Sequence, residues 1–491
     1  MLKKRPPVVV VLGSVDHGKT TLLDYIRINC AKAASPTAGE PRPVAGREAG
    51  GITQAIGAYE IQHKTSNNSR IEHLTFIDTP GHEAFSKMRS RGAKIADIAI
   101  LVVAADDSVK AQTKEAIKII LDSETPYVVA INKIDKQPEI TKVKNDLTQS
   151  NVLLEGYGGN IPFQPISAKT GEGINELLDL ILLTADLEDL QYDPDKKAKG
   201  YVLESKMDSR RGILASLIIK DGALKIGDEI FAGKSEGKVR SLENFLGKKI
   251  DRAEACAPVL ITGFNSLPKI GEEFEVGKLL PTAPTAIAKI VGPSNAGDTQ
   301  NKNLLRLILK SDVSGSVEAL SEVIRNLPAQ DKTIKIIEEG VGEITDGDVK
   351  MAISTNAAIV GFKTKITKAA ENLAREHRIQ IIQSEIIYEL IKAVEEELLT
   401  EKEKFEGKLE ILAIFSKKSK KQLIGGKILE GEIKVSSFLQ VERNKAILGR
   451  GKILSLQQNK KEVKRVEAGL ECGLIFESDI IIAVGDILIS H

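Results

Sequence analysis

The first third of the chain alternates short apolar runs with amphipathic stretches. Apolar runs occupy residues 8–12, 74–77 and 127–131 and have the length of buried strands. Residues 20–26 carry the spacing of a helix shortly after the first run. The pattern predicts a strand, a loop and a helix at the start of the chain, with polar strings where the strands end.

A second pattern, short alternating strands broken by glycine turns, fills two separate stretches further along the chain. Short strings recur between these stretches: residues 238–242 resemble 452–456, and residues 270–274 resemble 484–488. Two similar β-barrels are the simplest interpretation.

The region between the two expected barrels has a different pattern. An apolar strand at 304–310 and a helix start at 315–320 predict an α/β layer that continues to about residue 383. Residues 386–402 then have the i, i+3, i+4, i+7 spacing of an amphipathic helix, about 25 Å long at 1.5 Å per residue. This helix either carries the last barrel as a stalk or packs its first half on the α/β layer.

The string GSVDHGKT at residues 13–20 joins the first strand to the first helix. Glycines let the loop backbone curl around a phosphate, and the helix N-terminus adds positive potential. The lysine supplies a charge for the outer phosphates, and the threonine hydroxyl is a ligand for Mg²⁺. The expected nucleotide-binding residues of this P-loop are Gly13, Asp16, His17, Gly18, Lys19, Thr20 and Thr21, with His17 supporting the loop.

Two further strings follow buried strands in the order that a GTP-binding domain needs. DTPGH at 78–82 brings the Asp78 carboxylate to the metal beside Thr20, and Gly81 lets a backbone N–H approach the γ-phosphate. NKID at 132–135 offers a carboxylate to the N1–H and 2-amino groups of guanine, which adenine does not match. The expected base-pocket residues are Asn132, Lys133, Asp135, Ser167, Ala168 and Lys169. Each string alone also occurs in ordinary turns, but together they predict GTP or GDP as ligand.

Composition narrows the class of protein. At 491 residues and 42% hydrophobic, the chain can bury several cores, roughly three or four domains at about 150 residues each. Its 3 cysteines, Cys30, Cys256 and Cys472, are far apart, which argues against a disulfide scaffold or a zinc ribbon. No apolar stretch approaches the ~20 residues of a membrane span, and we expect no signal or transit peptide. The sequence predicts a cytoplasmic protein without a membrane partner.

The net charge of +1 argues against broad nucleic-acid binding, because RNA binding relies on basic surface. The total conceals local clusters at residues 417–421 and 459–465. These clusters are either solvated loops of a lysine-rich chain or contacts for RNA in the C-terminal part.

Together these strings resemble the translational GTPases and, among them, the family of bacterial initiation factor 2. Residues 48–59 resemble the switch I segment of that family, and residues 78–93 resemble its switch II segment. The resemblance implies that His82 is the catalytic residue that holds the attacking water when the ribosome presses it into place. It also implies that Thr53 joins Thr20 and Asp78 as a metal ligand.

The resemblance covers nearly the whole chain and implies a multidomain α/β and β fold. The expected parts are a P-loop GTPase domain at 1–190, a β-barrel domain at 195–282, a linker at 283–303, an α/β domain at 304–384, a connecting helix at 385–404 and a C-terminal β-barrel at 405–491. In the family, the terminal barrel binds formylmethionyl initiator tRNA. The implied contacts here are Glu471, Cys472, Gly473 and Lys460, although a cysteine in a barrel is usually a core residue.

The sequence departs from the family pattern in several places. Ser14 and Ala55 stand where the family has histidines, and Gly426 replaces a pocket cysteine. Residues 457–460 replace a basic-aromatic string, which predicts weaker tRNA binding or less selectivity for the formyl group. The chain begins close to the P-loop, so we expect a short form without the family's N-terminal extension.

The expected function is that of a monomeric translation initiation factor with GTP/GDP and Mg²⁺ as ligands. Such a factor promotes binding of initiator formylmethionyl-tRNA and joining of the small and large ribosomal subunits alongside other initiation factors, with GTP hydrolysis as the release step. Two alternatives stay open: another translational GTPase that delivers aminoacyl-tRNA, and an RNA-binding scaffold that does not turn over GTP.

Overall fold

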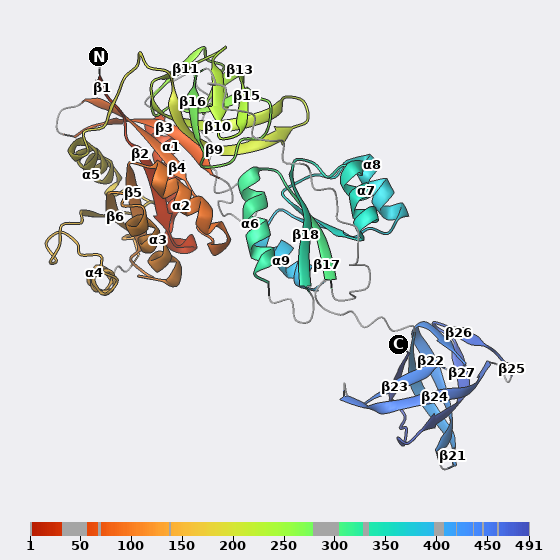
Figure 1. Ribbon diagram of the computed structural model, residues 1–491. Helices are drawn as coiled ribbons and strands as arrows, with labels where there is room; N and C mark the ends of the chain where they lie inside the picture. The colour runs from red at the N-terminus through yellow and green to blue at the C-terminus, as the bar shows by residue number, and fades with distance from the viewer. Residues whose placement is uncertain are drawn as a thin grey trace. The chain divides into compact units, whose positions relative to one another are not determined.

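The structure is a computed structural model that describes residues 2–31, 56–66, 70–136, 139–277, 304–327, 333–396, 407–418, 420–435, 437–443, 446–458 and 461–490. The chain forms two compact units, Met1–Glu395 and Glu396–His491 (Figure 1). Each unit is described by itself.

The first unit begins with a six-stranded sheet that has helices on both faces (Figure 1). Its strands are β2 (Val8–Gly13), β3 (Gly57–Lys64), β4 (Ile71–Asp78), β5 (Ile98–Ala104), β6 (Tyr127–Asn132) and β7 (Phe163–Pro165). Its helices are α1 (Lys19–Ala31), α2 (Ser86–Ile95), α3 (Ala111–Asp122), α4 (Ile140–Gln149) and α5 (Ile174–Leu187), with 3₁₀ turns η1 (Val15–His17) and η3 (Glu83–Phe85). The strand order is β3-β4-β2-β5-β6-β7, and only β3 runs antiparallel.

Successive residues of β2 point to opposite faces of this sheet. Val8 and Val10 pack with residues of α2, α3 and α4, whereas Val9 and Val11 pack with residues of α1 and α5. All residues of β2 and β5 are buried because helices cover both faces, which explains their uninterrupted apolar sequences. The carboxyl ends of the parallel strands therefore meet at one edge, where α/β sheets bind their ligands.

A closed barrel follows, after a short pairing of β1 (Lys3–Lys4) with β8 (Gln191–Tyr192). Its strands are β9 (Lys199–Asp208), β10 (Gly212–Asp221), β12 (Glu229–Ala232), β13 (Ser235–Asn244), β15 (Pro258–Phe264) and β16 (Glu273–Val276). Around the barrel they follow the order β9-β10-β15-β13-β12-β16. A separate two-stranded sheet pairs β11 (Ala223–Lys225) with β14 (Arg252–Glu254).

A buried charged cluster ties this barrel to the first sheet. The Arg5 guanidinium donates two hydrogen bonds to Asp97, at 2.8 and 2.7 Å, and the Lys220 ammonium of β10 donates to the same carboxylate at 2.6 Å. Arg5 also donates to Cys256 Sγ at 3.1 Å. Burial alone raises the pKa of Asp97, but Arg5 and Lys220 outweigh it and hold that pKa below its usual value. The cluster fixes the barrel against the sheet.

The first unit ends in a parallel α/β layer. Its strands are β17 (Leu304–Ser311), β18 (Thr333–Val341), β19 (Ala358–Phe362) and β20 (Ile381–Ser384), in the order β18-β17-β19-β20. Its helices are α6 (Ser314–Arg325), α7 (Asp346–Thr355), α8 (Lys368–Glu376) and α9 (Ile387–Val394).

Helix α9 is the described part of the connecting helix expected at 385–404. It buries Ile387, Leu390 and Val394 in this layer, which is the packing role left open for its first half. Residues 397–404 and the expected linker at 283–303 lie outside the described residues.

The second unit is a second six-stranded barrel. Its strands are β21 (Gly407–Lys418), β22 (Lys421–Lys434), β23 (Phe438–Arg443), β24 (Ala446–Gln458), β27 (Glu471–Ser478) and β28 (Ile487–Ser490), with short β25 (Lys461–Glu462) and β26 (Arg465–Glu467) beside them. The ring closes in the order β21-β22-β27-β24-β23-β28.

The two barrels have the same strand order, counted from the first strand of each. The related strings at 238–242 and 452–456 fall on the equivalent strands β13 and β24, which confirms the predicted repeat. The multidomain α/β and β fold is therefore confirmed. The domain bounds stay a prediction, and β8 ends two residues past the boundary expected at 190.

Candidate functional site

The loop between β2 and α1 has the shape that a phosphate group requires. Gly13 has φ of 144° and Gly18 has φ of 84°. A Cβ on Gly13 would lie 2.4 Å from the Val102 carbonyl oxygen, and one on Gly18 would lie 2.4 Å from the Asn132 side-chain nitrogen. Both positions therefore need glycine, because conformation and space each exclude a side chain.

Lys19 begins α1 and folds back over this loop. Its ammonium donates to the carbonyl oxygens of Gly13 at 2.9 Å and Ser14 at 2.7 Å. Burial lowers the pKa of Lys19 to about 8, although the nearby Asp78 carboxylate raises it. A phosphate group in the loop adds negative charge and favours the charged ammonium.

The DTPGH string reaches the same place from the end of β4. A Cβ on Gly81 would lie 2.4 Å from Lys19 Nζ, so the two strings meet where a γ-phosphate is expected. Asp78 pairs with Val11 in the sheet, next to the loop that leads to Thr20. A carboxylate and a hydroxyl near phosphates are the oxygen donors that Mg²⁺ takes in nucleotide sites, so these residues fit the metal. Thr53 lies outside the described residues.

His82 lies directly after Gly81 and is 4% exposed. Its Nδ1 accepts a hydrogen bond from the Ala84 backbone at 2.8 Å, while its Nε2 is buried and has no hydrogen-bond partner among the described residues. Burial lowers the pKa of His82, so the ring is neutral at pH 7. In this conformation the imidazole is shielded from water.

The guanine end is built from β6 and the loop after β7. Asn132 donates to the His17 carbonyl oxygen at 2.8 Å and accepts from the Ala168 backbone at 2.9 Å, so it joins the phosphate loop to the base loop. Asp135 accepts from the Ser167 hydroxyl at 2.7 Å, and this bond lowers the pKa of Asp135. Lys133 has φ of 67° and pairs with Asp106. The structure thus brings the expected base-pocket residues together.

Comparison with known proteins places this arrangement in a family. The family described as "Elongation factor Tu GTP binding domain" matches residues 4–186, "Elongation factor G domain 2" matches 197–277 and "Translation-initiation factor 2" matches 289–395. "Translation initiation factor IF-2" of Onion yellows phytoplasma is 37% identical over 510 residues, which cover 99% of this chain and 79% of that protein. The chain belongs to the translation initiation factor 2 family.

Other members of this family are longer. "Translation initiation factor IF-2" of Prochlorococcus marinus strain NATL2A is 39% identical over 502 residues, which cover 96% of this chain and 41% of that protein. The chain thus spans less than half the length of this relative. Among solved structures, a chain titled "Crystal structure of GDP-bound aIF5B from Aeropyrum pernix" is 28% identical with a TM-score of 0.49, and the match covers 99% of this chain and 92% of that one.

The GTP-binding family model covers the domain before the first barrel, and the initiation factor 2 model covers the α/β layer after it. The first domain is a GTP-binding domain. None of the helices among the described residues is long and apolar enough to cross a membrane.

Three of the four tRNA contacts that the resemblance implies, Glu471, Cys472 and Gly473, lie on β27 of the second barrel. Glu471 is exposed and Gly473 has no atom within 4 Å of a would-be Cβ, so both face outward. Cys472 is 6% exposed and packs in the barrel core opposite Gly426, and burial raises the pKa of its thiol to about 11. The position of Cys472 matches the core role left open for it, and its contact with a ligand stays a prediction. Lys460 lies outside the described residues.

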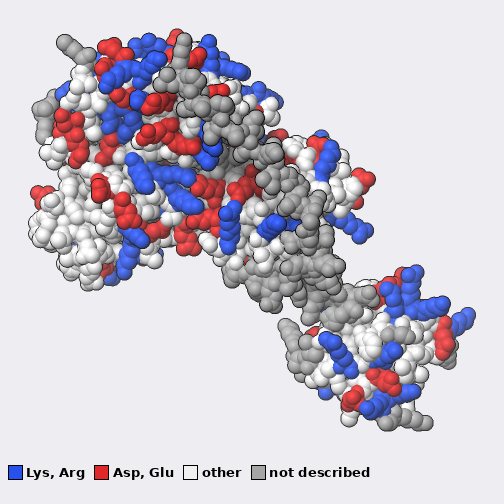
Figure 2. Space-filling view, in the orientation of Figure 1, with Lys and Arg blue, Asp and Glu red and all other residues white. Residues whose placement is uncertain are grey.

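Charge on the surface is mixed rather than concentrated. Figure 2 shows Lys and Arg interspersed with Asp and Glu on the visible face. In the second barrel, Lys420 pairs with Asp479 at 2.8 Å and Arg465 lies 3.6 Å from Glu432. These pairings reduce the positive charge that the barrel offers to RNA.

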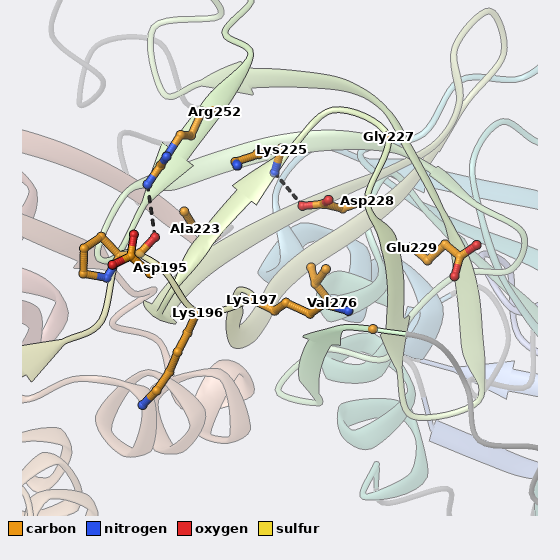
Figure 3. Close-up of a pocket in the computed structure, with 12 residues that line it drawn as sticks. Asp195, Lys196, Lys197, Ala223, Lys225, Gly227, Asp228, Glu229, Arg252 and Val276 are labelled. Atoms are coloured by element: carbon orange, nitrogen blue, oxygen red, sulfur yellow. Dashed lines mark hydrogen bonds between the residues drawn. The ribbon is translucent and has the colours of Figure 1, made fainter. Parts of the chain in front are cut away.

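A pocket of about 410 Å³ opens on the first barrel, away from the P-loop residues (Figure 3). Cationic and acidic side chains both line it, and Asp195 and Asp228 are two of the acids. Asp228 accepts a hydrogen bond from the Lys225 backbone N–H at 2.8 Å. Arg252 donates to the Pro194 carbonyl oxygen at 3.1 Å at the rim. Four cationic and three acidic side chains line this pocket, so its opposite charges nearly cancel.

Three residues of the GTP site were not expected from the sequence. Gln112 of α3 accepts from the Ser14 hydroxyl at 2.8 Å, which explains how serine is accommodated there. Arg89 is 1% exposed and donates to the carbonyl oxygens of Pro80 and His82. Tyr388 of α9 lies against His82. Arg89 lies in the switch II string, but Gln112 and Tyr388 come from segments that carry no motif.

Proposed function

We propose that this chain is a ribosome-dependent GTPase that acts in translation initiation. It promotes binding of initiator formylmethionyl-tRNA and joining of the small and large ribosomal subunits, and hydrolysis of GTP to GDP and phosphate is the release step. The observation that carries this proposal is that Gly81, with His82 next to it, meets Lys19 of the phosphate loop, while Asn132 joins that loop to the loop whose Ser167 holds Asp135. Membership of the initiation factor 2 family supports the same activity.

Nucleotide binding uses the two loops that Asn132 joins. The Lys19 ammonium exchanges its two carbonyl partners for the β- and γ-phosphates, while backbone N–H groups at the start of α1 face the phosphates. Thr20, Asp78 and Thr53 would hold Mg²⁺, which neutralises phosphate charge when bound. Asp135 selects guanine by accepting from its N1–H and 2-amino groups.

Hydrolysis needs a water in line with the γ-phosphate. The water oxygen bonds to the γ-phosphorus, the bond from phosphorus to the β–γ bridging oxygen breaks, and the water protons end on the phosphate product. His82 orients this water, since phosphoryl transfer depends mainly on positioning and electrostatics. The neutral imidazole suits this role, but its buried position requires a movement before it reaches the water.

We assign binding of the initiator tRNA to the second barrel and binding of the ribosome to the first unit. The outward face of β27 at Glu471 and Gly473 takes the aminoacyl end of the initiator tRNA, with Lys460 and Cys472 as further predicted contacts. The first unit docks on the ribosome beside other initiation factors, and the factor works as a cytoplasmic monomer. The mixed charge of the second barrel predicts modest tRNA affinity.

The test is GTP hydrolysis by the full chain with and without ribosomes. We expect ribosomes to accelerate turnover and His82→Ala to remove about 10²-fold or more of that rate, the usual value of one positioned transition-state contact. His73→Ala is the matched control, because His73 pairs with Glu60 on the antiparallel edge of the sheet. An RNA-binding scaffold predicts no loss in the His82 variant.

A second measurement addresses the tRNA partner. Binding of formylated initiator tRNA, unformylated initiator tRNA and an elongator tRNA is compared across a salt series. Preference for the initiator supports the initiation role, whereas preference for the elongator supports a factor that delivers aminoacyl-tRNA.

A further inference from the structure

The ring of Tyr388 lies over His82, although the two residues are far apart in the sequence. Their ring centroids are 3.9 Å apart and the ring planes make an angle of 66°. Tyr388 is 51% exposed, whereas His82 is 4% exposed. The tyrosine ring therefore lies between the His82 imidazole and the solvent.

The two ring nitrogens of His82 beneath this tyrosine differ in their hydrogen bonds. Nδ1 accepts from the Ala84 backbone, so the neutral ring carries its hydrogen on Nε2. Nε2 is buried without a hydrogen-bond partner among the described residues. A buried donor that lacks a partner is unfavourable, which indicates that this nitrogen is held ready for a ligand that arrives later.

The helix that carries Tyr388 is anchored. Ile387, Leu390 and Val394 of α9 are fully buried in the α/β layer. The same layer is bound to the switch II helix, because Arg91 of α2 donates two hydrogen bonds to Glu318 of α6, at 2.5 and 2.8 Å. Lys87 of α2 lies 3.4 Å from Glu322 of α6.

Two carboxylates, Asp16 of the phosphate loop and Glu83 after His82, lie near the phenol. Burial raises the pKa of Tyr388, and the negative charges of Glu83 and Asp16 raise it further. The hydroxyl therefore stays neutral at the mouth of the phosphate site, between the phosphate loop and switch II.

From this geometry we infer that Tyr388 is a positioning residue for GTP hydrolysis. Its ring holds His82 in the buried conformation while the factor is free, and docking on the ribosome displaces α9, together with the α/β layer that anchors it, and so releases the imidazole toward the γ-phosphate. The inference rests on the proposed function, in which His82 orients the attacking water. The alternative is that Tyr388 only packs against the surface of the switch.

The test is the rate of GTP hydrolysis by the full chain in the absence of ribosomes. We expect Tyr388→Ala to raise this rate by about 2- to 10-fold, which corresponds to the loss of one aromatic contact. Tyr388→Phe keeps the ring and keeps the low rate. Tyr157→Ala is the matched control, because Tyr157 is similarly exposed, at 49%, and contacts Phe163 and Lys144 instead of His82.

A double variant identifies the route of the effect. Adding Tyr388→Ala to His82→Ala gives no rise if the tyrosine acts through the histidine. With saturating ribosomes, Tyr388→Ala hydrolyses GTP at the rate of the unmodified chain, because docking already displaces α9.

Two outcomes would overturn the inference. One is an unchanged ribosome-free rate in Tyr388→Ala, and the other is an equal rise with and without His82. Either result leaves the proposed function in place if His82→Ala still abolishes ribosome-stimulated turnover. Failure of the proposed function is recognised separately, as GTP turnover by the unmodified chain that ribosomes do not accelerate.

Discussion

Replacing Asn132 with alanine would separate the two loops that hold the two ends of the nucleotide. The side chain is 1% exposed, donates to the His17 carbonyl oxygen at 2.8 Å and accepts from the Ala168 backbone at 2.9 Å. Alanine removes both bonds and leaves two buried backbone groups without this partner. We therefore expect Asn132 to act on the loops and Asp135 to act on the base.

The expected cost follows from those two groups. Each buried polar group that loses its partner costs about 1–3 kcal/mol, so the variant destabilises the GTP-binding domain by about 2–6 kcal/mol. That is a large part of the roughly 5–15 kcal/mol that stabilises a typical domain. Because both loops loosen, we expect the affinities for GDP, GTP and xanthosine triphosphate to fall by similar factors.

The measurement is the melting temperature of the GTP-binding domain, whose thermal transition is recognised because added GDP shifts it. The affinities for the three nucleotides are then measured by titration. Asn145→Ala is the matched control, since Asn145 is an exposed residue of α4. A variant with unchanged stability and a selective loss of guanine nucleotides would refute the reasoning, because Asn132 would then recognise the base.

Three further predictions concern the same site. Asp135→Asn replaces a carboxylate that only accepts by an amide that also donates, so the preference for GTP over xanthosine triphosphate falls by about 10²-fold or more in a binding titration; an unchanged preference contradicts the base contact. Burial lowers the pKa of His17 to about 4 from 6.5, so protons bind the unfolded chain first as pH falls. Stability is full above pH 6.5 and falls by up to about 3 kcal/mol toward pH 4. Denaturation at pH 7.5 and 5 shows a smaller difference in His17→Gln, and an equal difference in both proteins excludes His17. Gly81→Ala places a Cβ 2.4 Å from Lys19 Nζ and lowers GTP affinity relative to GDP by about 10-fold, the value of one charge-assisted hydrogen bond. Gly347→Ala is its control, with its nearest contact at 3.5 Å, and equal losses for both nucleotides argue against a γ-phosphate role.

Much of the GTP site was predictable because its information is local. The strand, the glycine loop and the helix at residues 8–26 are adjacent in the chain, and parallel strands carry their polar ends to one edge. The repeat of glycine turns and alternating residues was enough to predict two barrels, since three of the six strand pairs in each ring join barrel strands that follow one another in the chain.

The contacts between domains were not predictable in this way. Tyr388 reaches His82, Arg5 reaches Cys256 and Lys220 reaches Asp97 only after separate domains have packed, and no spacing in the sequence encodes these contacts. The sequence predicted only part of the role of Asn132, because its hydrogen-bond partners lie in two other loops. Helical periodicity at 386–402 did not distinguish a stalk from a packing helix, since both need one apolar face.

The shared strand order of the two barrels separates folding from recognition. In each ring the inward residues, such as Val239 and Ile453 on equivalent strands, fill the core, so the outward positions are free to change without altering the fold. The first barrel uses this freedom for the Lys220 contact with the GTP-binding domain, whereas the second exposes Phe415 and Phe438. The same barrel fold, used twice, thus provides a fixed contact between domains in the first barrel and an exposed surface in the second. We expect substitutions at the outward positions of one barrel to leave the fold of the other barrel intact.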